Sequence, residues 1–170
     1  MKTFEGRVAV VTGGSSGIGR ATAIGLARQG AKVLITGRRR QTLDEAMREH
    51  ANVDALIADV ADPVDASRTI GEALGRWGRL DILVNNAGAG ALLPLNAVSP
   101  EAMASILAVN VVGPSLLARE ALPHLATTRG TIVNVSSTFG HKAGAGLSHY
   151  AASKAALEHL TRCWALELAP

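Results

Sequence analysis

The stretch that decides the fold is Val8–Gly19, VAVVTGGSSGIG, in which an apolar run ends in a glycine-rich turn. Residues 7–12 are rich in β-branched side chains and are bounded by glycines, which predicts a buried strand. Apolar residues then recur at helical spacing over 18–29, and Gly30 stands where a C-terminal helix cap belongs. A strand, a tight turn and a helix in direct succession indicate an α/β unit.

The glycines of this turn have separate physical roles. Gly13 permits a tight turn, Gly17 lets backbone amides approach a pyrophosphate, and Gly19 lets the helix pack close to the strand. The positive N-terminal end of the helix then faces the phosphates. The strand–turn–helix context therefore predicts a dinucleotide-binding site, formed by Gly13, Ser15, Ser16, Gly17, Ile18 and Gly19.

Two other motifs overlap the same turn. Gly13, Ser15 and Gly17 also fit the Gly-x-Ser-x-Gly elbow that places a nucleophilic serine between a strand and a helix. A serine esterase is disfavoured because the turn follows the first strand and nothing marks an acid or a histidine as a partner of Ser15. The phosphate loop of nucleoside triphosphatases needs Gly-Lys before Ser or Thr, whereas Gly19 precedes Arg20-Ala21, so that class is excluded.

Beyond the turn, β-branched runs alternate with helix-forming segments. Strands are predicted at 32–36, 53–58, 80–84 and 131–136, and helices at 42–49, 65–76, 100–126 and 150–168. Pro114 and Pro123 are expected to kink or shorten the third of these helices. The alternation predicts a doubly wound parallel sheet with helices on both faces, a Rossmann-like α/β fold. No repeat or proline-rich linker divides the chain, so 1–170 is predicted to be a single domain.

Composition narrows the possible environments and partners. The 170 residues are 48% hydrophobic and 18% charged, with a net charge of +3 and one cysteine, Cys163. These values are typical of one globular core, and they indicate no nucleic-acid footprint and no metal cluster. The apolar run Val8–Val11 is too short for an export signal or a membrane span. A cytoplasmic protein without an intrachain disulfide is expected.

The residues after the second predicted strand indicate which dinucleotide is bound. An NAD-binding domain usually has an acidic residue there, about 20 residues beyond the glycines, for the ribose 2′-hydroxyl. This chain has Gly37 followed by Arg38-Arg39-Arg40. A guanidinium forms charge-assisted hydrogen bonds with phosphate. The sequence therefore favours NADP(H) over NAD(H), with Arg38 at the 2′-phosphate, whereas Arg39 and Arg40 individually are more typical of a solvated helix start.

Tyr150 and Lys154 are four residues apart at the start of the last predicted helix, so their side chains lie on one helix face. An ammonium beside a phenol stabilises the phenolate, which suits the phenol to acid–base catalysis near neutral pH. Tyr150 is also the only tyrosine in the chain. The same spacing occurs on ordinary solvated helix faces, so the pair predicts a catalytic site only together with its surroundings.

Five motifs, in order along the chain, resemble the short-chain dehydrogenase/reductase family. They are Thr12-Gly-x-x-x-Gly-Ile-Gly19, Asn85-Asn86-Ala87-Gly88, Asn110 within AVNV, Ser137 at the end of IVNVSS, and Tyr150-x-x-x-Lys154. The resemblance covers essentially the whole chain. It implies a hydride-transferring oxidoreductase with strand order 3-2-1-4-5, whose family strands 6 and 7 and C-terminal substrate lid are absent here.

The resemblance also implies a role for each matching residue. Tyr150 is expected to be the acid–base residue, and Ser137, thirteen residues earlier, rather than its neighbour Ser136, to hold the substrate oxygen. Lys154 is expected to make Tyr150 more acidic and to bind the nicotinamide ribose, and Asn110 to hold a water in a proton relay. The other matching positions are expected at the cofactor: Asp59 at the adenine ring, Val60 next to it, and Asn86, Ala87 and Gly88 beside the fourth strand.

Two hypotheses of function remain open. The first is an NADP(H)-dependent oxidoreductase acting on a small-molecule alcohol or ketone, in which the protein aligns the substrate and supplies the proton. The second is a truncated dinucleotide-binding module without turnover that pairs with another chain, because its fifth strand would be an uncovered edge. A homo-oligomer, dimer or tetramer, is expected through paired helices that include 100–126.

Overall fold

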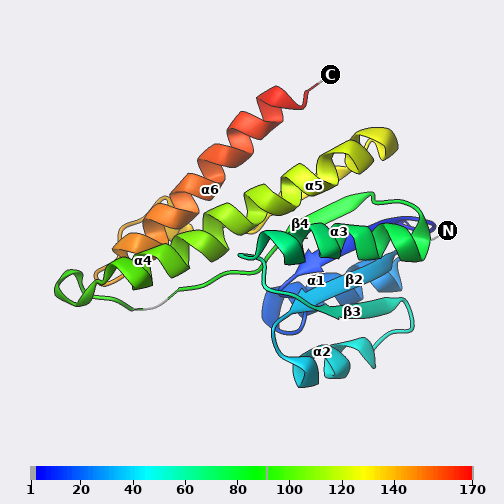
Figure 1. The fold of residues 1–170 in the computed structure, drawn as a ribbon, viewed down its shortest axis with the longest axis horizontal. Coiled ribbons are helices and arrows are strands. Elements are labelled where there is room, and N and C mark those ends of the chain that lie inside the picture. The colour runs from blue at the N-terminus through cyan, green and yellow to red at the C-terminus, as the bar shows by residue number, and fades with distance from the viewer. Residues whose placement is uncertain (1–2, 91, 170) are drawn as a thin grey trace.

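The predicted alternation of strands and helices is present in the computed structural model, which describes residues 3–90 and 92–169 (Figure 1). The elements in chain order are β1 (Val8–Thr12), α1 (Gly17–Arg28), β2 (Lys32–Gly37), α2 (Arg40–Met47), β3 (Val53–Ile57), α3 (Pro63–Trp77), β4 (Ile82–Asn85), α4 (Pro100–Leu107), α5 (Gly113–Thr128), β5 (Thr131–Asn134) and α6 (Ser148–Glu167). All strand pairs are parallel, in the order β3-β2-β1-β4-β5. The predicted fold class and strand order are confirmed.

Helices cover both faces of the sheet because alternate strand residues point to opposite sides. On one face, Ala9 and Val11 of β1 belong to an apolar cluster with residues of α1 and α2. On the other face, Val8 and Val10 belong to a second cluster with residues of α3 and α5. β1 is therefore buried throughout, as a central parallel strand requires. The two layers of helices fix the carboxyl ends of the strands, where the site lies.

A buried carboxylate joins the beginnings of β1 and β4. Asp81 is only 2% exposed, and it accepts hydrogen bonds from Val8 N (2.9 Å), Arg7 Nη1 (2.7 Å) and Arg79 Nη2 (2.7 Å). Burial alone would raise the pKa of Asp81, but the hydrogen bonds from the two arginines and from Val8 N outweigh it and hold that pKa below its usual value. The ionised Asp81 is therefore part of the folded structure.

The helix predicted at 100–126 is continuous but contains a wider turn. α4 and α5 are joined by a π-helical turn, Ala108–Val112. Pro114 follows that turn, while Pro123 lies inside α5 without ending it. The expected kink is thus replaced at Pro114 by a local change of helix type, a frequent feature of functional sites.

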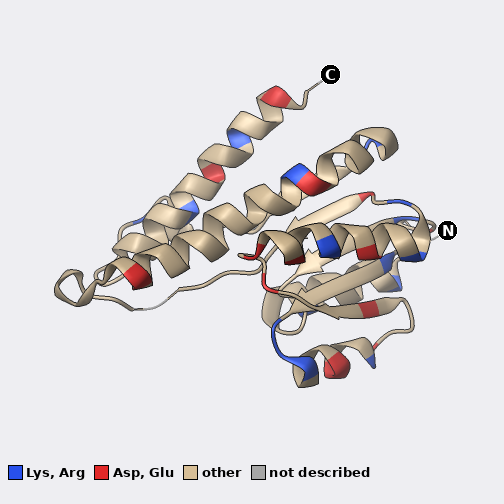
Figure 2. Cartoon of the chain, viewed as in Figure 1, with Lys and Arg blue, Asp and Glu red and all other residues tan. Residues whose placement is uncertain are grey.

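The whole stretch Pro100–Thr128 has the length and apolar composition of a membrane-spanning helix, although core helices of globular proteins meet the same criterion. In its most apolar window, 33% of the residues are buried. Here α5 packs on α3 and on β4, within the helical layer of the sheet. Figure 2 shows few charges along α4 and α5 and many around α2 and α3.

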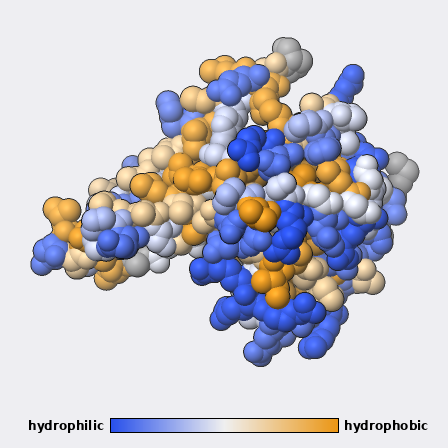
Figure 3. All heavy atoms as spheres, viewed as in Figure 1, coloured by the Kyte–Doolittle hydropathy of each residue, from blue (hydrophilic) through white to orange (hydrophobic). Residues whose placement is uncertain are grey.

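The strand β5 lies at one edge of the sheet, beside α5 and α6. An open groove of about 880 Å³ lies between the C-terminal parts of α5 and α6 and the strand β5, and α6 extends away from the sheet toward its C-terminal end (Figure 1). Its lining is largely apolar and includes Leu125, Ile132 and Trp164. Hydrophobic surface is visible along these helices in Figure 3. We call this hollow the C-terminal groove.

Candidate functional site

The glycine turn is shaped by close contacts with the end of β4. Gly13 and Gly17 have left-handed φ angles of 61° and 52°, a region that favours glycine. A Cβ atom on Gly19 would collide with Asn86 Nδ2 and with the carbonyl oxygen of Gly13. The Asn86 side chain instead donates to the carbonyl oxygens of Thr12 (2.9 Å) and Gly13 (3.2 Å). These contacts explain the requirement for small residues at the start of α1.

Thr12 is a positioning residue to which the sequence analysis gave no role. Its buried hydroxyl oxygen accepts from the backbone N–H groups of Asn86 and Ala87, both at 3.0 Å, and its hydroxyl donates to the carbonyl of Val84. Thr12 thus fixes the segment after β4 against the segment after β1. The sequence signal that could have indicated this role is a small hydroxyl residue directly before the glycines.

Most of the predicted cofactor residues line one groove at the carboxyl ends of the strands. This hollow, which we call the nucleotide groove, has a volume of about 220 Å³. It brings together the predicted residues Gly13, Ser15, Ser16, Arg38, Asp59, Val60, Ala87 and Gly88. Gly17 and Gly19 line neither this groove nor the adjoining cavity. Their contribution in the structure is to the path of the turn.

The three consecutive arginines separate between two surfaces. Arg38 and Arg39 both line the nucleotide groove, next to Ser15 and Gly37. Within residues 3–90 and 92–169, neither forms an ion pair with a carboxylate, whereas Arg40 pairs with Asp44 on α2. Arg39 was expected only to solvate the helix start, yet it lies beside Arg38. The position of the bend after β2 determines which arginines face the groove, and the residue type alone does not predict that position.

Asp59 and Val60 follow β3 and line the same groove as Arg38 and Arg39. The Asp59 Oδ1 atom accepts from the backbone N–H of Ala61 at 3.0 Å, and the Asp59 N–H donates to Asp65 Oδ2 at 2.8 Å. Asp65 in turn pairs with Arg68, and hydrogen bonds from Arg68 and from the Asp59 N–H lower the pKa of Asp65. This loop is held in place by its own polar groups, and the contact of Asp59 with an adenine ring stays a prediction.

A second cavity, of about 460 Å³, adjoins the nucleotide groove at Gly88 and Ala89. We call it the Tyr150 cavity. Tyr150 and Lys154 line it from the first turns of α6, and Ile18 and Asn86 line it as well. The ring of Tyr150 packs on Gly90, where a Cβ atom would come within 2.8 Å of the ring. The structure therefore brings the predicted Tyr–Lys pair to the end of the predicted cofactor groove.

Lys154 places a buried ammonium group at this cavity. Its side chain is 4% exposed, and its Nζ atom donates to the carbonyl of Val135 at 2.9 Å. Burial lowers the pKa of the Lys154 ammonium, because a charged group loses hydration inside the protein. The Nζ atom has three donors, so the bond to Val135 leaves two for other acceptors. Gly88 leaves space beside it: a Cβ atom there would lie 3.6 Å from Nζ.

Asn110 lies in the π-helical turn and connects the loop after β4 to α6. Its fully buried side chain accepts from Ala89 N (2.8 Å) and donates to Ala89 O (2.7 Å) and Ser153 Oγ (2.9 Å). Ser153 then donates to the carbonyl of Tyr150 at 2.7 Å. Asn110 therefore positions the helix that carries Tyr150. Ser153, next to Lys154, is a member of this network that sequence reasoning missed.

The two serines after β5 have different partners. Ser136 lines the Tyr150 cavity, and its hydroxyl donates to Glu158 Oε1 at 2.7 Å. Ser137 does not line that cavity. Its Oγ atom accepts from Phe139 N at 3.2 Å, which caps the short 3-10 turn Thr138–Gly140, η3. Acceptance leaves the O–H of Ser137 available as a donor. The role of Ser137 at a substrate oxygen stays a prediction.

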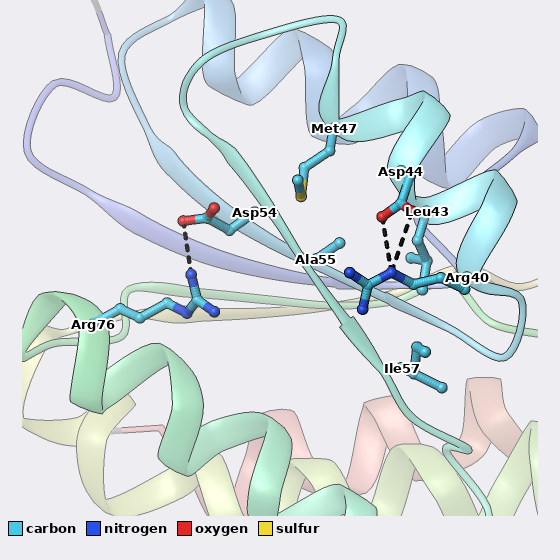
Figure 4. Close-up of a pocket in the computed structure, with 8 residues that line it drawn as sticks. All are labelled: Arg40, Leu43, Asp44, Met47, Asp54, Ala55, Ile57 and Arg76. Atoms are coloured by element: carbon cyan, nitrogen blue, oxygen red, sulfur yellow. Dashed lines mark hydrogen bonds and ion pairs between the residues drawn. The ribbon is translucent and has the colours of Figure 1, made fainter.

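A separate pocket of about 270 Å³ lies at the outer edge of β3 (Figure 4). Its two arginines are both paired: Arg40 with Asp44, and Arg76 with Asp54 at 3.2 Å and with Glu72. The pocket contains none of the predicted site residues. Over the described parts of the chain, no group of three or more His, Cys, Asp or Glu side chains is arranged to hold a metal ion.

The doubly wound sheet, the glycine turn and the two adjoining cavities define a nucleotide-binding type of α/β fold with a Tyr–Lys pair in the cavity next to the nucleotide groove. The family model for short chain dehydrogenases matches residues 7–170, and the chain belongs to this oxidoreductase family. The predicted resemblance is confirmed. Known structures agree, because the chain superposes with a TM-score of 0.92 on a metagenomic short-chain oxidoreductase in complex with NADP. That structure is 36% identical and is matched over 97% of this chain and 77% of its own.

Relatives of known name include dehydrogenase/reductase SDR family member 2, mitochondrial, of Homo sapiens, which is 41% identical over 96% of this chain and 60% of the relative. The L-xylo-3-hexulose reductase of Hypocrea jecorina is 38% identical over 99% of this chain and 64% of the relative. The chain thus spans about three fifths to two thirds of the length of these relatives.

Proposed function

We propose that this chain binds NADP(H) and transfers a hydride between the nicotinamide and the carbon of a small-molecule alcohol or ketone. The observation that carries the proposal is the junction of the two cavities at Gly88 and Ala89. A dinucleotide laid along the nucleotide groove would end beside Tyr150 and Lys154. Two features support the fit. The glycine turn has no room for side chains at Gly13 and Gly19, and Arg38 and Arg39, which form no ion pair among the described residues, line the groove.

The preference for NADP(H) over NAD(H) rests on Arg38 and Arg39. Where NAD-binding domains usually have an acidic residue that accepts a hydrogen bond from the ribose 2′-hydroxyl, this chain has Gly37. A Cβ atom added at Gly37 would lie 3.2 Å from Ser15 Oγ. Two guanidinium groups beside Ser15 are suited to a 2′-phosphate. The NADP complex of the metagenomic relative supports the same reading. Arg38 and Arg39 would then hold the phosphate together.

In the proposed reduction the nicotinamide supplies the hydride, and the side chains of this chain handle the oxygen and the proton. Tyr150 would protonate the developing alkoxide, while the free O–H of Ser137 would hold that oxygen by a hydrogen bond. Lys154, buried beside the same cavity, would stabilise the phenolate left on Tyr150 and use its remaining donors on the nicotinamide ribose. This division of roles is the proposed mechanism.

Asn110 would complete the proton path through its backbone. Its side-chain amide is engaged by Ala89 and Ser153, so the proposed water would bind elsewhere on this residue. Pro114 stands four residues later and has no N–H, so the carbonyl of Asn110 lacks its α-helical donor. That carbonyl is the acceptor we assign to the water.

The substrate assignment and the assembly are also proposals. Exposed apolar residues along α4, the π-helical turn and α5, namely Leu107, Val112 and Leu122, support a homo-oligomer, dimer or tetramer, formed through these helices. We place the protein in the cytoplasm, without a membrane or nucleic-acid partner. The second candidate, a dinucleotide-binding module without turnover that pairs with another chain, is favoured by the open C-terminal groove and the edge strand β5.

Cofactor oxidation with a panel of ketones tests the proposal. We expect NADPH absorbance to fall with at least one ketone, and we expect Tyr150→Phe to lower kcat by about a hundredfold or more while NADPH still binds. Turnover that survives Tyr150→Phe contradicts the proposed chemistry. NADPH binding by the wild-type chain without turnover of any ketone favours the second candidate.

A further inference from the structure

One carboxylate of α6, that of Glu158, contacts both ends of the loop that carries Ser137. Glu158 lies one helical turn after Lys154, and its side chain is 14% exposed. Its Oε1 atom accepts from Ser136 Oγ at 2.7 Å, and its Oε2 atom lies 3.0 Å from His141 Nδ1. Ser136 and His141 stand on either side of Ser137 in the sequence. One side chain of the helix therefore contacts both ends of the loop.

The backbone of the loop is fitted closely around this carboxylate. Gly140 packs directly on Glu158, since a Cβ atom on Gly140 would collide with the carboxylate. The loop is a short turn in which Gly140 N donates to Ser137 O at 2.9 Å and Phe139 N donates to Ser137 Oγ at 3.2 Å. Displacement of Glu158 would thus act on the same turn that orients the Ser137 hydroxyl.

Glu158 extends a row of polar contacts on one face of α6. Lys154, Glu158 and Thr161 follow the i, i+4, i+7 spacing of a single helix face. Lys154 donates to the carbonyl of Val135, and Thr161 accepts from Asn134 Nδ2 at 2.8 Å. These two contacts hold the end of β5 and the residue after it. Glu158 is the member of the row that holds the chain beyond that point.

We propose that Glu158 is a positioning residue, which fixes the Ser137 loop against α6 and so sets the distance between the Ser137 hydroxyl and Tyr150. The inference rests on the proposed function of these two residues. A partly buried carboxylate requires hydrogen-bond partners, and both of its partners lie on the loop. Because a displacement of about 1 Å at a reacting group can lower a rate about a hundredfold, the loss of Glu158 reduces catalysis without touching the cofactor.

The test compares Glu158→Ala with Glu158→Gln, using Glu167→Ala as the matched control. Gln keeps an acceptor for Ser136 and an amide for His141 but has no charge, whereas Ala removes both contacts. Glu167 lies at the exposed end of the same helix. We expect Glu158→Ala to lower kcat by about 10- to 100-fold with an unchanged Kd for NADPH. The kcat of Glu158→Gln should stay within a few-fold of the wild-type value. The kcat of Glu167→Ala should equal the wild-type value.

Amide hydrogen exchange supplies a readout that does not depend on turnover. In Glu158→Ala the amides of Phe139, Gly140 and His141 should exchange faster than in the wild type, and in Glu158→Gln they should not. If Glu158→Ala fails to fold, Ser136→Ala takes its place, because it removes one of the two contacts of Glu158. A smaller increase in the exchange rate of the loop amides is then expected. If the loop amides of the variant exchange at the same rate as those of the wild type, the inference is overturned.

The two proposals fail in different ways. A wild-type chain that oxidises NADPH with no ketone contradicts the proposed function, and the loop exchange then decides the role of Glu158 alone. Turnover in the wild type together with unchanged kcat and unchanged loop exchange in Glu158→Ala contradicts only the positioning role.

Discussion

If the chain prefers NADP(H) as proposed, three neighbouring arginines should contribute differently to the affinity for NADPH. Arg38 and Arg39 line the nucleotide groove without an ion pair to a carboxylate among the described residues, while Arg40 pairs with Asp44 and faces the pocket at the edge of β3. Arg38→Ala and Arg39→Ala should each weaken NADPH binding, and Arg40→Ala should not. Arg40 is a matched control because it has the same chemistry at the next position of the chain.

The magnitude follows from the exposure of these side chains. A hydrogen bond to a charged group contributes about 1.5–3 kcal/mol, and Arg38 and Arg39 are both exposed, which places each contact at the lower end. About 1.5 kcal/mol corresponds to slightly more than tenfold in Kd. Each single variant should therefore bind NADPH about tenfold more weakly, and the double variant should approach about a hundredfold if the effects add.

Isothermal titration of the purified chain with NADPH and with NADH is the assay. Binding of NADH, which has no 2′-phosphate, should change little in all three variants. The expected loss should also shrink at high salt, because exposed charges are screened. The reasoning is wrong if Arg40→Ala weakens NADPH binding as much as Arg38→Ala does, or if the wild type binds NADH more tightly than NADPH.

Three further perturbations probe the glycine turn and the fold. Gly19→Ala should abolish dinucleotide binding in the same titration, because its Cβ would collide with Asn86 and Gly13, whereas Gly25→Ala, which has open space around it, should bind normally. Asp81→Asn should lower the free energy of unfolding in urea by about 2 kcal/mol. Because the pKa of Asp81 is lowered in the fold, this difference should be complete above about pH 4 and disappear as the pH falls through that lowered pKa; a difference that persists in acid contradicts it. Arg129→Gly should raise the stability by about 0.5–1 kcal/mol, since Arg129 caps α5 with a φ of 51°, and an unchanged midpoint in urea would argue against strain there.

The fold could be predicted from sequence because the strands and the helices have different periods. Buried β-branched runs such as β1 predict strands, and the glycine turn predicts a helix directly after the first strand. For a chain of this length in which strands and helices alternate, these signals predict a parallel sheet covered by helices on both faces. Some element boundaries differ from the predicted ones. α3 begins at Pro63, two residues before the prediction, because Asp62 caps it by accepting from Val64 N and Asp65 N. β5 ends at Asn134, before the predicted 136, since Val135 and Ser136 turn toward α6.

The candidate site was predictable where its residues follow a local motif. Tyr150 and Lys154 share a helix face, so their common cavity follows from spacing. The partners of Glu158 did not follow, because Ser136 lies 22 residues away and only tertiary packing brings them together. The π-helical turn at Asn110 was likewise missed: a proline in a helix predicts a disturbance, but its form depends on the contacts of the neighbouring residues.

The position of α6 has a consequence for how this molecule loses activity. Arg38, Arg39 and the glycine turn belong to the first half of the chain, whereas Tyr150 and Lys154 stand on α6, which contacts the sheet at the edge strand β5. Local opening of α6 would remove the proposed proton donor, Tyr150, and leave the nucleotide groove intact. Mild heating should then produce a species that still captures NADPH but is chemically silent, so cofactor retention alone is an unsafe measure of an active preparation.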